Sequence, residues 1–378
     1  MSGRSGYSER VLRAELLVLI VCGVSTALAV ALTRLVIGYG HRHELLDGPA
    51  GFGHEKALRA VPNIGGIAIF ASIVLPLAVL MVWSVVGAQH ELAVALRAEA
   101  AVVLVLMLTI FALHTLGVVD DRHPLPATPK LAAMALVATV PVALLDIRLL
   151  TFLDAQPGGV LLSTVLSIVW ILAITNAINF LDNMDGVCAG LSAIIASVLL
   201  VIALRSGDLP SALVLGCTAG SAIGFLVWNR PRARIFMGDG GSLVLGFLLA
   251  VVSVRLTYFD AGADESPWTA VFVPLAVFAV PVYDMTSVIV IRLSQGKSPF
   301  IGDQQHFTHR IRKRGLSDRR TLFVVLGCAV ISGMSGLLML SLVPTLAPVA
   351  GMQVVLVLVI LAVYERGALR SHSESGTP

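Results

Sequence analysis

The sequence of 378 residues carries little charge, with 13% Asp, Glu, Lys and Arg against about 25% in an average soluble domain. Hydrophobic residues make up 57% of the chain and the mean hydropathy is +0.91, so too few polar side chains remain to cover a water-soluble surface. This excludes a soluble enzyme and a disordered chain. The apolar stretches run unbroken and do not alternate, which disfavours a β-barrel. The composition therefore predicts a polytopic helical membrane protein.

Cysteine is also scarce. Four cysteines lie in or beside apolar stretches and none belongs to a C-x-x-C pair: Cys22, Cys188, Cys217 and Cys328. We interpret them as small core residues and expect neither a disulfide nor a zinc site. The sequence shows no internal repeat, no low-complexity tract and no soluble domain. We expect one integral membrane domain over residues 1–370 and a disordered tail over 371–378.

Eleven apolar stretches approach the length of about 20 residues that a spanning helix needs. They are 13–37, 63–87, 99–118, 130–145, 160–179, 187–204, 209–228, 240–258, 268–291, 322–343 and 346–364, of which 130–145 is the weakest. Arg10 and Arg13 precede an apolar run that contains Ala27-Leu28-Ala29, so the first stretch could be a signal peptide. We favour a retained helix because the run continues to Leu32. The prediction is an all-α fold of about 10–11 spanning helices.

Basic residues are distributed unevenly among the connections between these spans. The odd-numbered connections, with the adjoining span ends, hold 16 Lys and Arg, and the even-numbered ones hold 4. The positive-inside rule therefore places the odd connections in the cytoplasm and the protein in the cell (cytoplasmic) membrane. Arg4, Arg10 and Arg13 disagree with this topology, which leaves the side of the N-terminus open.

Acids, amides and histidines gather in the same odd connections. Because a carboxylate is costly to bury in a membrane, such residues usually face a partner or a water-filled site. The first cluster is Asp120 and Asp121 at the end of a span, followed by Arg122 and Lys130. Adjacent carboxylates suit Mg²⁺ bound together with phosphate oxygens. The alternative is a plain helix end paired with the two basic residues.

The second cluster has a polar residue at every third position: Asn176, Asn179, Asp182 and Asp185. This spacing nearly lines one face of a helix. No Lys or Arg in this connection neutralises the two acids, which indicates an external cation or a polar ligand. The alternative is a polar seam between helices.

The third cluster is the segment Asn229–Ser242. Its three arginines can pair with phosphates: Arg230, Arg232 and Arg234. Asp239 lies between glycines just before a span whose N-terminus favours an anion. Phe236 could stack on a base. The alternative is a positively charged loop with a tight turn.

Two further clusters follow along the chain. Asp284 lies inside an apolar span, where it could support the site or make a bond between helices. His306 and His309 share a face if their segment is helical, and they could bind phosphate, a nucleotide or a metal, although two histidines alone do not make a zinc site. The flanking basic residues, which include Arg319 and Arg320, could instead bind anionic lipid headgroups. Together the five clusters indicate phosphoryl chemistry between a soluble nucleotide and a lipid phosphate.

At these residues the sequence resembles the polyprenyl-phosphate N-acetylhexosamine-1-phosphate transferases, glycosyltransferase family 4. The family signatures G-x-x-D-D, N-x-x-N-x-x-D-G-x-D-G-L, N-x-x-x-x-x-x-F-M-G-D-x-G-S and H-x-H-H-R stand here as Gly117–Asp121, Asn176–Gly186, Asn229–Ser242 and His306–Arg310. Pro62–Gly66 is similar to the family's P-x-x-G-G. The chain departs from the pattern at Asn183, where relatives have Gly, and at Thr308, where they have His.

The resemblance implies transfer of a sugar-1-phosphate from a UDP-sugar to undecaprenyl or another polyprenyl phosphate, with Mg²⁺, or Mn²⁺ as the alternative ion, and release of UMP. It implies no nucleic-acid partner, and homodimers are common among relatives. The His306 motif with Arg310, together with Gly315-Leu316-Ser317, looks like the branch that starts O-antigen, teichoic acid or related glycans from UDP-GlcNAc. The alternative is the UDP-MurNAc-pentapeptide branch of peptidoglycan synthesis, whose run of consecutive histidines is absent here.

The resemblance also implies a role for each site residue. Asp239 is the expected main metal ligand, and the catalytic and metal-binding set is Asp120, Asp121, Asp182 and Asp239. The expected substrate-binding set is Lys130, Asn176, Asn179, Asp185, Asn229, Phe236, His306, His309 and Arg310. Among these, Lys130 is expected on the lipid phosphate and Phe236 on the uracil. One-step attack and a two-step route through an aspartyl-phosphate both stay open.

Two other classes are weaker. A CDP-alcohol phosphotransferase needs D-G-x-x-A-R, but Gly190 follows Ala189 here. A secondary transporter typically places its acids near the bilayer midplane and carries internal repeats. Here the acids gather at one face, and the sequence shows no repeat.

Overall fold

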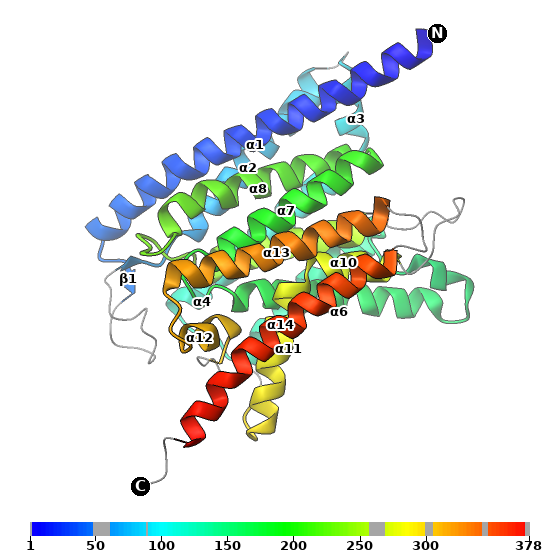
Figure 1. Cartoon of the computed structure of the whole chain (residues 1–378). Helices are drawn as coiled ribbons and strands as arrows, with labels where there is room; N and C mark the ends of the chain where they lie inside the picture. The colour runs from blue at the N-terminus through cyan, green and yellow to red at the C-terminus, as the bar shows by residue number, and fades with distance from the viewer. Residues whose placement is uncertain are drawn as a thin grey trace.

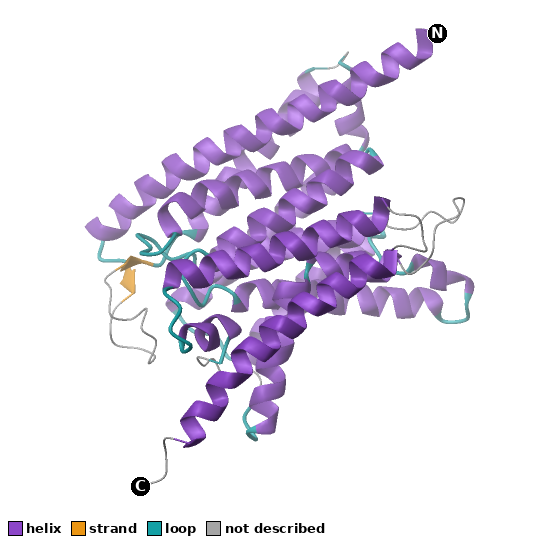
Figure 2. Cartoon of the chain, viewed as in Figure 1, coloured by secondary structure: helices purple, strands orange, loops and turns teal. Residues whose placement is uncertain are grey.

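The computed structural model describes residues 2–47, 61–87, 90–256, 269–298, 305–341 and 347–374. Helices dominate this part of the chain (Figures 1 and 2). They are α1 Ser2–Arg42, α2 Gly66–Val86, α3 Glu91–Ala98, α4 Ala100–Arg122, α5 Ala127–Leu145, α6 Gly159–Phe180, α7 Val187–Ser206, α8 Leu209–Asn229, α9 Asp239–Arg255, α10 Thr269–Val277, α11 Ala279–Ser294, α12 Phe307–Arg312, α13 Asp318–Ser341 and α14 Ala347–Glu374. A 3₁₀ turn covers Thr151–Ala155, and two short antiparallel strands, β1 Leu46–Asp47 and β2 Val61–Pro62, pair with each other.

The predicted helical membrane fold is confirmed. In the described ranges, nine helices are long and apolar enough to span a membrane, and a bent pair would make a tenth. The bent pair corrects one prediction, because α10 and α11 replace the single span expected over 268–291 and meet at 80°. The break falls at Phe278, whose buried ring packs edge-on against Trp170.

The span expected over 240–258 is shorter than predicted. Helix α9 has 17 residues and is therefore ~25 Å long, less than the ~30 Å of a bilayer core. Every residue from Gly240 to Val254 is buried, because α4, α6, α7, α8 and α2 surround the helix. Helix α9 is thus the centre of the bundle.

The first apolar stretch forms one helix that continues through Ala27-Leu28-Ala29 to Arg42. Figure 1 shows α1 running along α8. Small residues permit this close packing. A methyl group on Gly224 would lie 2.5 Å from the carbonyl oxygen of Thr26 in α1.

The odd connections meet at one end of the bundle, as predicted from their polar residues. At this end α4, α6 and α8 stop and α5, α7 and α9 begin, and we call it the site end. Figure 2 shows the strand pair and many of the loops gathered there.

All four cysteines are free, as predicted. Helix α14 extends to Glu374, into the segment expected to be disordered, and residues 375–378 lie outside the described ranges.

Candidate functional site

The N-terminus of α9 is the centre of the site. Gly238 precedes the helix with φ of 68°, a conformation that glycine adopts without strain. Asp121 accepts hydrogen bonds from the backbone N–H groups of Asp239 at 2.8 Å and Gly240 at 3.2 Å, and Asp182 accepts from Gly238 at 3.2 Å. Two predicted metal ligands therefore hold this turn, where free N–H groups and the helix dipole favour negative charge.

Glycines let two helix ends, the start of α2 and the end of α4, approach this turn closely. Gly65 and Gly66 donate backbone hydrogen bonds to the carbonyls of Phe236 at 3.0 Å and Met237 at 2.9 Å. A methyl group on Gly117 of α4 would lie 2.5 Å from the carbonyl oxygen of Asp239. The P-x-x-G-G and G-x-x-D-D segments thus meet the Gly-Asp-Gly turn backbone to backbone.

A lysine lies between two of the carboxylates. Lys130 Nζ donates to Asp120 Oδ2 at 2.8 Å and to Asp239 Oδ2. Asn179 Nδ2 donates to the other oxygen of Asp239, Oδ1, at 2.9 Å and to Ser242 Oγ at 2.8 Å. The Lys130, Asp120 and Asp239 side chains are 18%, 15% and 23% exposed, so a solute can reach them. We call Asp120, Asp121, Asp182 and Asp239 the acid cluster.

Within the described residues, no group of three or more His, Cys, Asp or Glu is arranged to hold a metal ion. The acid cluster instead divides into two pairs. Asp121 and Asp182 bind backbone N–H groups, whereas Asp120 and Asp239 share Lys130. The second pair is the one whose oxygens are already directed at a cation.

Two residues of the expected substrate-binding set, Asn229 and Asp185, tie loops together in this structure. Asn229 is 2% exposed, and its amide accepts from Gly186 N–H at 3.0 Å and donates to Ile235 C=O at 2.8 Å. Asp185 accepts from Ala233 N–H at 2.9 Å. They therefore fasten the α6–α7 turn to the segment after α8. Their role toward a substrate stays a prediction.

Phe236 is 3% exposed and packs with Val61 and Ala233.

The expected polar row from Asn176 to Asp185 is only partly helical, because α6 ends at Phe180 and both acids of the row follow in a turn. Asn176, on the helix, donates back to Leu172 C=O. The left-handed residue of this turn is Gly186, with φ of 79°.

The histidine segment is helical over α12, Phe307–Arg312, and His306 is the N-cap residue of this helix. His306 Nδ1 lies 2.7 Å from Asp284 Oδ2, and Asp284 Oδ1 accepts from Phe307 N–H at 2.8 Å. Asp284 is fully buried, so it fixes the ring of His306, whose edge also meets Phe180. These bonds join α11 to the start of α12 and also hold His306, so they fit both roles considered for Asp284, and its part in a site stays a prediction.

Arg310 differs from the expected pattern. Its guanidinium is buried and forms a two-pronged ion pair with Glu365 of α14 at 2.9 and 3.0 Å, and it also donates to Ser287 Oγ at 2.7 Å. The group therefore fastens α12 to α11 and α14. Sequence reasoning missed Glu365, although a single acid in an apolar span is a signal of such a partner. His309 is half-buried on the same helix.

The two positions at which the chain departs from the family pattern contact each other. Thr308 Oγ1 donates to Asn183 Oδ1 at 2.8 Å, and Asn183 Nδ2 donates to Phe180 C=O at 2.7 Å. This bond links α12 to the turn that carries Asp182 and Asp185. The two residues that differ from the family pattern are thus hydrogen-bonded to each other.

The fold and the site define a polytopic membrane protein with a carboxylate–lysine centre at one end of its bundle. Residues 102–257, from α4 through α9, match the model of "Glycosyl transferase family 4". The chain belongs to this family, which confirms the resemblance seen in the sequence.

Three curated relatives illustrate the range of the family. The chain is 29% identical to the "Probable undecaprenyl-phosphate N-acetylglucosaminyl 1-phosphate transferase" of Bacillus subtilis, over 76% of this chain and 75% of that protein. It is 34% identical to the "Decaprenyl-phosphate N-acetylglucosaminephosphotransferase" of Mycobacterium leprae, over 56% of this chain and 58% of that protein, which is less than two thirds of its length. It is 32% identical to the "Phospho-N-acetylmuramoyl-pentapeptide-transferase" of Mycolicibacterium smegmatis, over 63% of this chain and 76% of that protein.

Proposed function

We propose that this chain transfers GlcNAc-1-phosphate from UDP-GlcNAc to polyprenyl phosphate, such as undecaprenyl phosphate, and releases UMP. The product, a polyprenyl-diphosphate-sugar, would begin the membrane stage of a cell-surface glycan. The observation that carries the proposal is Lys130 between Asp120 and Asp239 at the N-terminus of α9. Family membership and the GlcNAc-transferase names of two relatives support it.

The residues of this centre suit a phosphate-bearing substrate. Lys130 holds a positive charge in a part-buried position, and a phosphate can take over its bonds from the carboxylates. In the proposed reaction, an oxygen of the lipid phosphate forms a bond to the β-phosphorus of the UDP-sugar. The bond from that phosphorus to the bridging oxygen breaks, and UMP leaves. Positioning of the two phosphates supplies most of the catalysis in such displacements.

A divalent cation fits the same centre. Mg²⁺ usually takes one or two carboxylates together with substrate phosphates and keeps several waters. Asp239 and Asp120 are the residues that would hold Mg²⁺, or Mn²⁺ in its place, because their oxygens already face a cation. The ion would neutralise charge on the diphosphate. Asp121 and Asp182 are then positioning residues, since they hold the backbone of the Gly238–Gly240 turn.

The histidine segment is the second part of the proposed site. The bond from Asp284 to Nδ1 leaves Nε2 of His306 for the sugar or the diphosphate. The nucleotide would lie near Asp185, Asn229 and Phe236. The excess of Lys and Arg in the odd connections supports a cytoplasmic orientation of this end, on the side where nucleotide sugars are made. A single domain and a homodimer stay predictions.

The proposal can be tested with purified full-length protein in detergent. The assay supplies undecaprenyl phosphate, MgCl₂ and, in separate tubes, UDP-GlcNAc, UDP-GalNAc or UDP-MurNAc-pentapeptide, and follows UMP. We expect UMP from UDP-GlcNAc, lost with EDTA, and a loss of about 100-fold or more in Asp239→Asn. Asp146→Asn is the matched control, because Asp146 is 76% exposed, lies away from the acid cluster and has a left-handed φ of 51° that Asn tolerates.

The same assay contains the second candidate. UMP release from UDP-MurNAc-pentapeptide alone would move the chain to the branch of the Mycolicibacterium smegmatis relative and overturn the donor proposed here. No UMP from any donor, with the protein shown to be folded, would contradict the reaction itself.

A further inference from the structure

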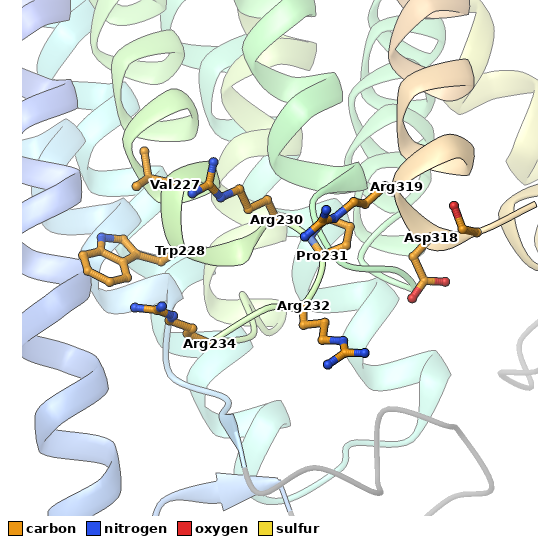
Figure 3. A pocket seen from close by; sticks show the side chains of 9 residues that line it. Val227, Trp228, Arg230, Pro231, Arg232, Arg234, Asp318 and Arg319 are labelled. Atoms are coloured by element: carbon orange, nitrogen blue, oxygen red, sulfur yellow. The ribbon is translucent and has the colours of Figure 1, made fainter.

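A cavity lies at the site end, beside the turn that follows α8. Its volume is about 820 Å³. The residues around it come from the end of α8, from the following turn and from the start of α13: Val227, Trp228, Arg230, Pro231, Arg232, Arg234, Ser317, Asp318 and Arg319. Figure 3 shows the arginines of the turn with Arg319 and Asp318 facing them from α13. No residue of the acid cluster lines this cavity, and neither do His306 and His309.

The charge of this cavity is strongly positive. Asp318 is its one acid, and Arg312, which does not line the cavity, pairs with it at 2.7 Å. The four lining arginines make no ion pair within the ranges that the structure describes, and Arg234 lies over the Trp228 ring at 5.5 Å. Four guanidinium groups around one space repel each other unless an anion lies among them. Arginine binds phosphate through two parallel hydrogen bonds, which makes phosphate the matching anion.

The cavity also lies at the boundary between apolar and polar surface. Its walls are the ends of α8 and α13, both of which are candidate spans. On α8, Val227 is 45% exposed and Ile223, one turn earlier on the same face, is 42% exposed. On α13, Phe323 is 79% exposed and lies four residues after Arg319, on the same face. Exposed apolar side chains thus continue from the arginines into the spans.

We propose that this cavity binds the phosphate headgroup of an acidic phospholipid, such as phosphatidylglycerol, whose acyl chains lie along α8 and α13. The headgroup lies at the level at which the helices end, and Trp228 is of the residue type enriched there. Charge alone would equally suit the diphosphate of a soluble nucleotide. The exposed apolar faces of α8 and α13 favour the lipid.

The bound lipid would join α13 to the segment 230–235. The backbone N–H of Ala233 in that segment binds Asp185, so lipid occupancy would hold the α6–α7 turn in place. Binding to this cavity does not require the transferase reaction. The protein can therefore release UMP without binding lipid in this cavity, or bind lipid there without releasing UMP, so the two proposals fail separately.

The test uses full-length protein in detergent with equal amounts of phosphatidylglycerol and phosphatidylcholine, and native mass spectrometry counts the bound lipids. We expect selective retention of phosphatidylglycerol by the wild type and about tenfold weaker retention by the double variant Arg230→Gln/Arg319→Gln. Arg320→Gln is the matched control, because Arg320 is exposed on α13 next to Arg319 but does not line the cavity. We expect it to retain phosphatidylglycerol like the wild type.

Three outcomes would overturn the proposal. Equal retention by the double variant and Arg320→Gln would mean that the lipid binds elsewhere or through general charge. If UDP or inorganic phosphate displaces phosphatidylglycerol at concentrations near its own dissociation constant for the protein, the ligand of the cavity is a soluble phosphate. If the double variant keeps the lipid but raises the KM for the UDP-sugar tenfold, the cavity belongs to the nucleotide. The single variants Arg230→Gln and Arg319→Gln provide the same comparison if the double variant does not fold.

Discussion

The close approach of α4 to the N-terminus of α9 predicts a specific effect of Gly117→Ala. The added methyl group would lie 2.5 Å from the carbonyl oxygen of Asp239, whereas ordinary contacts begin at 3.4 Å. Helix α4 and the turn must therefore separate by about 0.9 Å. Because Asp120 and Asp121 are on α4, this shift moves them away from Asp239. Misplacement of about 1 Å costs on the order of 100-fold in rate.

The assay is UMP release by purified Gly117→Ala, with the melting temperature measured on the same sample. We expect a rate about 100-fold below wild type, while the overpacking costs about 1–3 kcal/mol of stability. Gly327→Ala on α13 is the matched control, because a methyl group there meets nothing within 4 Å. Gly327→Ala should keep its activity because no neighbouring atom has to move. Its stability should not fall, since alanine favours a helix by up to about 1 kcal/mol over glycine. A Gly117→Ala enzyme with wild-type turnover would refute the reasoning that backbone contact sets the spacing of the acids.

Two further predictions concern the histidine segment. Asp284→Asn removes one of two acceptors for His306 and Phe307; a buried bond to a charged group is worth about 1.5–3 kcal/mol, so kcat should fall roughly ten- to a hundredfold in steady-state kinetics. Unchanged kcat would mean that the orientation of His306 does not matter. Thr308→Val keeps the shape but removes the hydrogen bond to Asn183, and turnover should fall up to about tenfold, whereas Thr308→Ser should retain it. Equal losses in both variants would point to packing instead.

Much of the site was predictable from the sequence. The acids, amides and histidines concentrated in the odd connections predict that these connections lie close together. In the structure, the acid pair, Lys130, Asn179 and Asp239 do come together. These residues were identifiable because a charge at a membrane edge has few structural uses. The number of spans was predictable only to within one or two, because hydropathy does not separate a lipid-facing helix from one buried in protein such as α9.

Other features depend on tertiary contacts that a local pattern does not contain. The break at Phe278 lies between Pro274 and Pro281, which mark a weak point in the apolar run, but the packing of the Phe278 ring against Trp170 is not visible in the sequence. Arg310 looks like a phosphate ligand until Glu365, 55 residues away, is placed beside it. Asn229 has the residue type of a nucleotide ligand, yet both polar atoms of its amide bind backbone groups. A sequence motif marks a residue without stating which of its partners is the protein itself.

The backbone-to-backbone junction of Gly66, Gly117 and the turn before α9 has a practical consequence. Main-chain atoms in contact keep these helix ends together, so the spacing of the centre does not depend on the Asp120 and Asp239 side chains. An inactive Asp239→Asn protein should therefore remain an intact scaffold. Such a protein is a suitable starting material for capturing both substrates side by side, because it would hold them without consuming them.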